Sequence, residues 1–133
     1  MDIAQLQKVL QPLFPGLMGV QLTEATPERV TATLRVRPDL CTAGGILHGG
    51  AYMAFADALG AIGGALNLTP GTRTTTLESK TNFLRGSPVG TTVTGEATPL
   101  HIGRRSSVWQ TRLTNDEGKL LALVTQTQMT IEA

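Results

Sequence analysis

The sequence is poor in the residues that define several large classes of protein. Its single cysteine, Cys41, excludes an internal disulfide, and two histidines with one cysteine make a zinc site improbable. Charged residues make up only 16% of the chain, with a net charge of +1, which is unlike a nucleic-acid binder. We expect no signal peptide, and the longest apolar stretch is interrupted by Asp57 and rich in glycine, which disfavours a membrane span. We expect a cytoplasmic protein with no metal, nucleic-acid or membrane partner.

The composition predicts a small folded unit with a covered surface. A chain of 133 residues suggests one domain, residues 1–133, and 41% hydrophobic residues can fill a core. The low charge content indicates that another subunit covers part of the surface.

The central feature of the sequence is a long helix that begins after His48 and ends near Asn67. One face carries apolar residues at three- and four-residue steps: Tyr52, Phe55, Leu59, Ile62 and Leu66. The other face has no solvated character and holds Met53, Asp57, Gly60, Ala61 and Gly64. Such a helix is normally buried, and its glycines indicate close approach to another backbone.

The remaining chain predicts a short helix and several strands. Asp2 can cap a helix whose shared face would hold Ile3, Leu6, Val9, Leu10 and Leu13. Alternation and β-branched residues predict strands over residues 18–22, 30–37, 74–84, 91–100, 106–113 and 120–131, with a bulge or bend at Gly95. Asn115–Gly118 joins the last two as a hairpin. The order predicts an α+β fold in which a curved antiparallel sheet of five to six strands wraps the long helix.

Asp57 is the first candidate for chemistry. A carboxylate on a buried helix face lowers the stability of the fold unless it is paired with another group or takes part in a reaction. Asp57 is therefore either a structural group or a catalytic one, which would act as a nucleophile or a general base. Gly49 and Gly50 begin the helix, where free N–H groups favour an oxyanion. Gly49 and Asp57 are separated by about 12 Å along a helix, too far to act on one carbonyl. We therefore expect each site to combine Gly49 of one subunit with Asp57 of another.

Four segments together resemble the hot-dog fold acyl-CoA thioesterases. They are Gly45–Ala51, Asp57, Asn82–Gly86 and Gly103–Ser106, and the resemblance covers roughly residues 17–131. The branch they resemble holds the phenylacetate-degradation and Arthrobacter-type 4-hydroxybenzoyl-CoA thioesterases. The resemblance implies a homodimer with a continuous sheet, commonly paired into a tetramer. It also implies hydrolysis of an acyl-CoA without a metal or cofactor. Tyr52, Phe55 and Phe83, beside small alanine and glycine residues, could accept an aryl or medium-chain acyl group.

The resemblance also implies roles for individual residues. Asp57 falls at the catalytic acid, and the Gly49 amide would polarise the thioester carbonyl, while His48 touches substrate or holds the loop. Thr42 stands where related enzymes often place Asn or Gln, and Ala61 stands where the Arthrobacter-type enzymes carry a hydroxyl. Residues expected to bind coenzyme A or the rest of the substrate are Gly50, Asn82, Phe83, Arg85, Gly103, Arg104, Arg105 and Ser106.

Two other functions remain open from the sequence. A hydroxyacyl dehydratase of the same fold would use a histidine facing an acid, and His48 with Asp57 resembles such a pair. A non-catalytic acyl-CoA binding module is the other alternative, although the retained Asp57 disfavours it.

Overall fold

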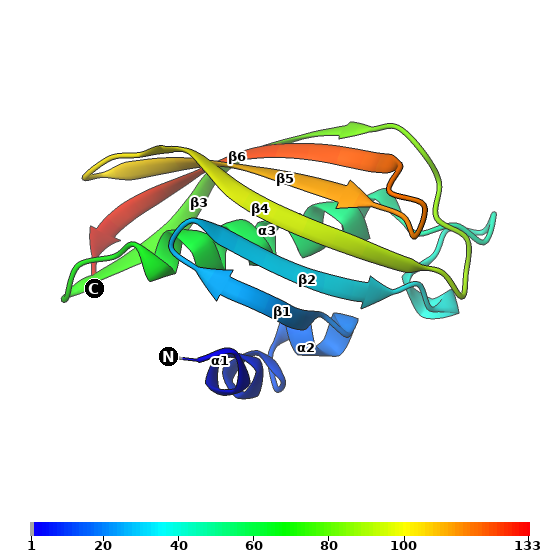
Figure 1. The fold of residues 1–133 in the computed structure, drawn as a ribbon, viewed down its shortest axis with the longest axis horizontal. Coiled ribbons are helices and arrows are strands. Elements are labelled where there is room, and N and C mark those ends of the chain that lie inside the picture. Colours follow the sequence, from blue (N-terminus) through cyan, green and yellow to red (C-terminus); the bar gives the residue numbers. More distant parts are fainter. Residues whose placement is uncertain (1) are drawn as a thin grey trace.

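The predicted α+β hot-dog architecture is confirmed by the computed structural model, which describes residues 2–133. A long helix, α3 (Gly49–Leu66), lies along one face of a six-stranded sheet and contacts every strand of it (Figure 1). The helix begins and ends where the sequence predicted, with His48 as its N-cap and Asn67 as its C-cap.

The sheet is antiparallel throughout and has the order β1-β2-β4-β5-β6-β3. Because β3 pairs only with β6 within the described chain, its other edge is open along 12 residues. The register of this pair shifts between Thr76 and Glu78, which marks a bulge near the middle of β3. The strands are β1 (Gln21–Thr26), β2 (Arg29–Arg35), β3 (Thr72–Phe83), β4 (Thr92–Ile102), β5 (Ser106–Thr114) and β6 (Leu120–Glu132).

The N-terminal segment differs from the prediction. The expected helix is present as α1 (Ile3–Leu10), and a capping box between Asp2 and Gln5 forms its N-terminus. Val9, however, is exposed rather than packed. The strand expected over residues 18–22 is wrong, because residues up to Met18 form a second helix, α2 (Phe14–Met18). Its C-cap, Gly19, has a left-handed φ of 92°, which ends the helix and delays the first strand to β1. A 3₁₀ turn, η1 (Pro38–Leu40), follows β2.

The glycines of α3 pack against the chain's own sheet, which corrects the expected division of the helix into faces. A Cβ at Gly60 would lie 2.3 Å from the side-chain amide carbon of Gln126, and one at Gly63 would lie 2.5 Å from the Trp109 ring. Gly95 is not a bulge: it gives room to Leu59 and Phe55, and the bulge of β4 lies between Pro99 and His101.

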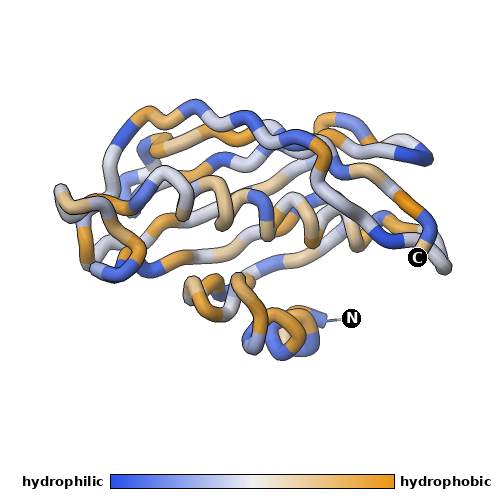
Figure 2. Tube along the Cα trace, turned by 180° about the vertical axis from the view of Figure 1, so that it is seen from behind, coloured by the Kyte–Doolittle hydropathy of each residue, from blue (hydrophilic) through white to orange (hydrophobic). Residues whose placement is uncertain are grey.

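The exposed side of α3 is therefore lined by small residues rather than by glycine. Seen from the helix side (Figure 2), the long helix crosses the sheet and the two N-terminal helices lie along its flank. Met53 is 37% exposed, and Ala54, Asp57, Ala58 and Ala61 are half-buried. The core beneath the helix contains the fully buried Phe55, Leu59 and Trp109.

Candidate active site

Asp57 lies in the middle of α3 and is half-buried. Its Oδ1 accepts a hydrogen bond of 2.6 Å from Thr76 Oγ1 on β3. The residue lines a cavity of about 420 Å³ between α3 and the N-terminal helices, and its other lining residues are apolar: Leu10, Phe14, Pro15, Ala54, Ala58, Ala61, Ile62 and Ala65. The arrangement places one acceptor group on the wall of an otherwise apolar space.

Thr76 is a residue that sequence reasoning missed. The resemblance directed attention to Ala61, which has no hydroxyl, whereas the hydroxyl that meets Asp57 comes from a strand 19 residues away in sequence. The run Thr74–Thr76 was interpretable only as β propensity. Side-chain alternation along β3, which makes Thr74 and Thr76 half-buried and Thr75 exposed, was the available signal.

The start of α3 offers a free backbone donor. His48 Nδ1 accepts from the Gly50 N–H at 2.8 Å, so the ring caps the helix and holds the loop. Within residues 2–133 the Gly49 N–H has no acceptor, as expected for the first residue of a helix. The capping contact of His48 is thus defined, its role toward a substrate stays a prediction, and the Gly49 N–H is free of partners within the described chain.

Gly49 shares a cavity of about 380 Å³ with three other predicted residues, Thr42, Phe83 and Arg85. Tyr52 forms part of the same wall. Its hydroxyl donates to the Arg85 carbonyl at 3.2 Å and is 2.5 Å from Ser87 Oγ, and burial raises its pKa above the ordinary value of 10. This buried pair fixes the loop after β3 against the helix.

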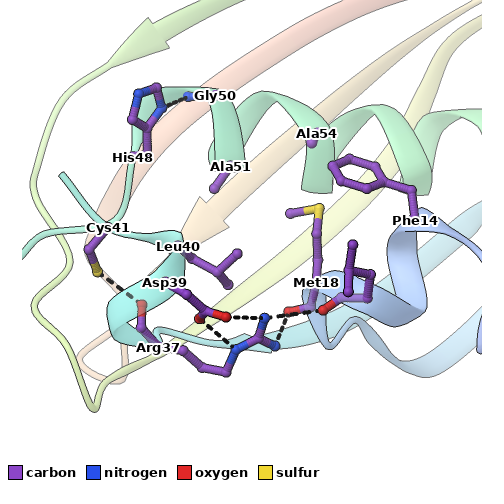
Figure 3. A pocket seen from close by; sticks show the side chains of 11 residues that line it. Phe14, Met18, Arg37, Asp39, Leu40, Cys41, His48, Gly50, Ala51 and Ala54 are labelled. Carbon is purple, nitrogen blue, oxygen red and sulfur yellow. Dashed lines mark hydrogen bonds and ion pairs between the residues drawn. The ribbon is translucent and has the colours of Figure 1, made fainter.

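Other predicted residues lie apart from this cavity. Asn82 accepts a hydrogen bond from Lys80 at 3.1 Å on the exposed end of β3 and lines none of the cavities described. Gly50 lines a pocket of about 370 Å³ between α2 and α3 (Figure 3). There the Arg37 guanidinium bonds to Asp39 and to the last carbonyls of α2, so it holds α2 against the turn after β2. The hydrogen bond from Arg37 lowers the pKa of Asp39.

Gly103 and Arg104 lie at the opposite end of α3 from Gly49. They line a cavity of about 570 Å³ with residues at the helix end: Gly64, Asn67, Leu68 and Thr69. An 18-residue helix is about 27 Å long, so Arg104 and Gly49 of one chain are far apart. Arg105 and Ser106 do not line this cavity, whereas Ser107, which was not predicted, does.

Comparison with known proteins places the chain in a family. The model of the thioesterase superfamily matches residues 44–122. The 1,4-dihydroxy-2-naphthoyl-CoA hydrolase of Escherichia coli is 30% identical over 105 residues, which is 79% of this chain and 76% of that protein. A thioesterase structure from Haemophilus influenzae superposes with a TM-score of 0.93 at 28% identity, covering 99% of this chain and 92% of that one. A mutant thioesterase from Pseudomonas aeruginosa superposes with a TM-score of 0.94 at 29% identity, covering 100% and 96%.

The chain therefore belongs to the thioesterase superfamily, and the predicted enzyme class, a thioester hydrolase, is confirmed. Among residues 2–133, no three histidine, cysteine, aspartate or glutamate side chains gather in a way that could hold a metal ion. In the same part of the chain, no helix has the length and apolar character needed to cross a bilayer.

Proposed function

We propose that this enzyme hydrolyses an acyl-CoA with an aryl or medium-chain acyl group to the free acid and coenzyme A, in the cytoplasm and without a cofactor. The observation that carries the proposal is the half-buried Asp57 carboxylate on the wall of an apolar cavity. A cavity floored by alanines suits a flat ring or an unbranched chain. The Escherichia coli relative is a 1,4-dihydroxy-2-naphthoyl-CoA hydrolase, and this supports the aryl alternative.

In the proposed reaction the Gly49 N–H donates to the thioester carbonyl oxygen, where negative charge develops as the carbon becomes tetrahedral. Asp57 acts in one of two ways. As a general base it takes a proton from water, which attacks the carbon; as a nucleophile it attacks directly and forms an anhydride that water then opens. In both cases the C–S bond breaks and the coenzyme A thiolate leaves and is protonated.

The proposed site needs two copies of the chain. Gly49 and Asp57 line different cavities, and eight helical residues separate them by about 12 Å. Pairing of the open β3 edges of two copies would extend the sheet and set their α3 helices antiparallel. Gly49 of one copy would then approach Asp57 of the other. The low charge content and the small residues on the outer side of α3 support this homodimer, and two dimers would form the tetramer.

The same arrangement supplies cations for coenzyme A. In an antiparallel pair, the end of one α3, which shares a cavity with Gly103 and Arg104, lies beside the start of the other α3. There Thr42, Phe83 and Arg85 line the Gly49 cavity. Guanidinium groups bind phosphates through paired hydrogen bonds. We assign Arg85, Arg104 and Arg105 to the nucleotide phosphates, Phe83 and Asn82 to the pantetheine arm, and Gly50, Gly103 and Ser106 to the loops that shape its path.

The geometry does not favour the dehydratase alternative. His48 Nδ1 is an acceptor from Gly50, so in the neutral ring the proton is on Nε2, which is then a donor and not a base. A dehydratase would add water to crotonyl-CoA, and we expect no such hydration.

The test is a thiol-release assay with aryl, short and long acyl-CoA substrates. Asp57→Asn is nearly isosteric and should reduce turnover on the order of 10²–10⁴-fold, or more if Asp57 is a nucleophile. Asp116→Asn, an exposed carboxylate in the β5–β6 turn, is the matched control and should leave the rate unchanged. Activity of Asp57→Asn within about threefold of the wild type would reject the assignment. Tight binding of an acyl-CoA with no thiol release would instead identify a binding module.

A further inference from the structure

A chain of hydrogen bonds connects the backbone of α3 to the Asp57 carboxylate through β6 and β3. Gln126 Nε2 donates to the Ala56 carbonyl at 2.9 Å, and Gln126 Oε1 accepts from Gln128 Nε2 at 2.5 Å. Gln128 Nε2 also donates to Thr76 Oγ1 at 2.7 Å, and Thr76 Oγ1 donates to Asp57 Oδ1 at 2.6 Å. The Gln126 and Gln128 side chains form a polar layer beneath α3, and because each is 1% exposed this layer is shielded from water.

The direction of every hydrogen bond in this series is set by the Ala56 carbonyl. The Ala56 carbonyl can only accept, so Gln126 must turn its NH₂ group toward it and its oxygen toward Gln128. Gln128 must therefore present its NH₂ group to both Gln126 and Thr76, with its own oxygen accepting from Thr74 Oγ1 at 2.8 Å. Thr76 accepts from Gln128, so its single proton is committed to Asp57.

This polar layer is costly for the fold. Two buried primary amides are tolerated only when their hydrogen bonds are made. The helix above them carries Gly60 and Gly64, where a Cβ would lie 2.3 Å from the Gln126 amide carbon and 3.2 Å from Gln128 Cγ. Glycine weakens a helix by about 1 kcal/mol relative to alanine. Apolar residues at these positions would pack more simply, so the layer serves something besides stability.

We infer that Gln126, Gln128 and Thr76 are positioning residues that hold the Asp57 carboxylate in one orientation for attack. Thr76 occupies Oδ1, and Oδ2 has no partner within residues 2–133, which leaves it for the reacting water or the thioester carbon. The inference rests on the proposed hydrolysis, in which Asp57 is the catalytic residue. A carboxylate held by a shielded, one-directional chain does not need to reorient during the reaction.

The test compares Thr76→Val, which keeps the shape and removes the hydroxyl, with Thr76→Ser, which keeps the hydroxyl. A hydrogen bond to a charged group predicts a loss in kcat on the order of 10–100-fold for the valine variant, with KM nearly unchanged. The serine variant should recover most of the rate. Thr81→Val is the matched control, because its hydroxyl is on the same strand, buried and without a hydrogen-bond partner among the described residues. Wild-type kcat in Thr76→Val would overturn the inference, as would an equal loss in Thr76→Ser.

Gln128→Met provides a second perturbation that does not touch the strand edge. It removes the donor to Thr76, so the hydroxyl is no longer committed to Asp57, and kcat should fall by less than in Thr76→Val. The double variant should lose no more than Thr76→Val alone, since both act through one chain of bonds. Additive losses would show that the glutamine and the threonine act separately, which would overturn the proposed network.

A crystallographic comparison separates this inference from the proposed function. In the wild type the Asp57 carboxylate should adopt one orientation with Oδ1 at Thr76, and in Thr76→Val it should turn or occupy several. If the wild type released no thiol from any acyl-CoA, the proposed hydrolysis would fail, but the carboxylate orientation in the two structures would still decide the positioning role. An unchanged carboxylate in Thr76→Val would overturn it.

Discussion

Mixing two inactive variants tests whether the site is divided between subunits. Asp57→Asn removes the carboxylate and leaves the Gly49 amide intact. Gly49→Val leaves Asp57 intact and is designed to obstruct the amide. Its Cβ would lie 3.2 Å from the Phe83 ring, which is half-exposed and can shift, and its two methyl groups would add bulk at the wall of the cavity that Gly49 lines. Each variant alone should be almost inactive, for opposite reasons.

The expected recovery follows from counting. Equal amounts of the two chains, unfolded and refolded together, should give about one half heterodimers. Each heterodimer has one site with an intact Gly49 from one chain and an intact Asp57 from the other, and a second site with both defects. The mixture should therefore reach about a quarter of the wild-type rate per chain.

The assay is thiol release after refolding, with differently tagged chains to measure the heterodimer fraction. Refolded samples of each variant alone are the controls. If tagged heterodimers form and the rate stays at the level of the separate variants, the two groups act within one chain, and the argument from their separation along α3 is wrong.

Three further outcomes test other parts of the structure. Replacing Arg104 and Arg105 with alanine should raise KM for acyl-CoA about tenfold and leave an acyl-pantetheine substrate nearly unaffected, whereas equal losses on both would assign the arginines to the fold. Tyr52→Phe should lower the free energy of unfolding by about 1–3 kcal/mol, because Ser87 loses its buried partner. Because the pKa of Tyr52 is raised in the folded state, the neutral side chain contributes fully to the free energy of unfolding below about pH 10, and this contribution is lost as the pH rises toward the pKa of the folded state. Urea titrations should show this alkaline loss of stability in the wild type and a weaker one in Tyr52→Phe. Gly63→Ala should lower thermal stability despite the better helix propensity of alanine, since its Cβ would overlap the indole ring beneath it; an unchanged Tm would show that the ring can shift.

Local patterns in the sequence predicted the elements whose structure is dictated locally. The apolar spacing from Tyr52 to Ile62 and the caps at His48 and Asn67 give α3, and the strict alternation of residues 30–37 gives β2 (Arg29–Arg35). The missed helix α2 also has a local signal, since Pro15 stands inside its start and Gly19 just past its end.

Contacts between residues far apart in the sequence could not be predicted from local residue patterns. The glycines of α3 correctly indicated a close approach, but what approaches is the side chains of Gln126, Gln128 and Trp109, about 50 or more residues later. Alternation shows that Gln126 and Gln128 share a face of β6 without showing that this face is the buried one. The partner of Asp57 depends on the register of β3 against β6, which no local rule specifies.

The pairing of β3 with β6 also determines the order in which the molecule can be completed during synthesis. Among the described residues, β3 pairs only with β6, which leaves the ribosome after β4 and β5 are already able to pair with each other. Until β6 is made, β3 has no sheet to join. The β3 edge that would pair with a second copy and the hydrogen bond from Thr76 to Asp57 are therefore both unformed. Assembly and the chemical site would thus mature in one late event, after the synthesis of β6.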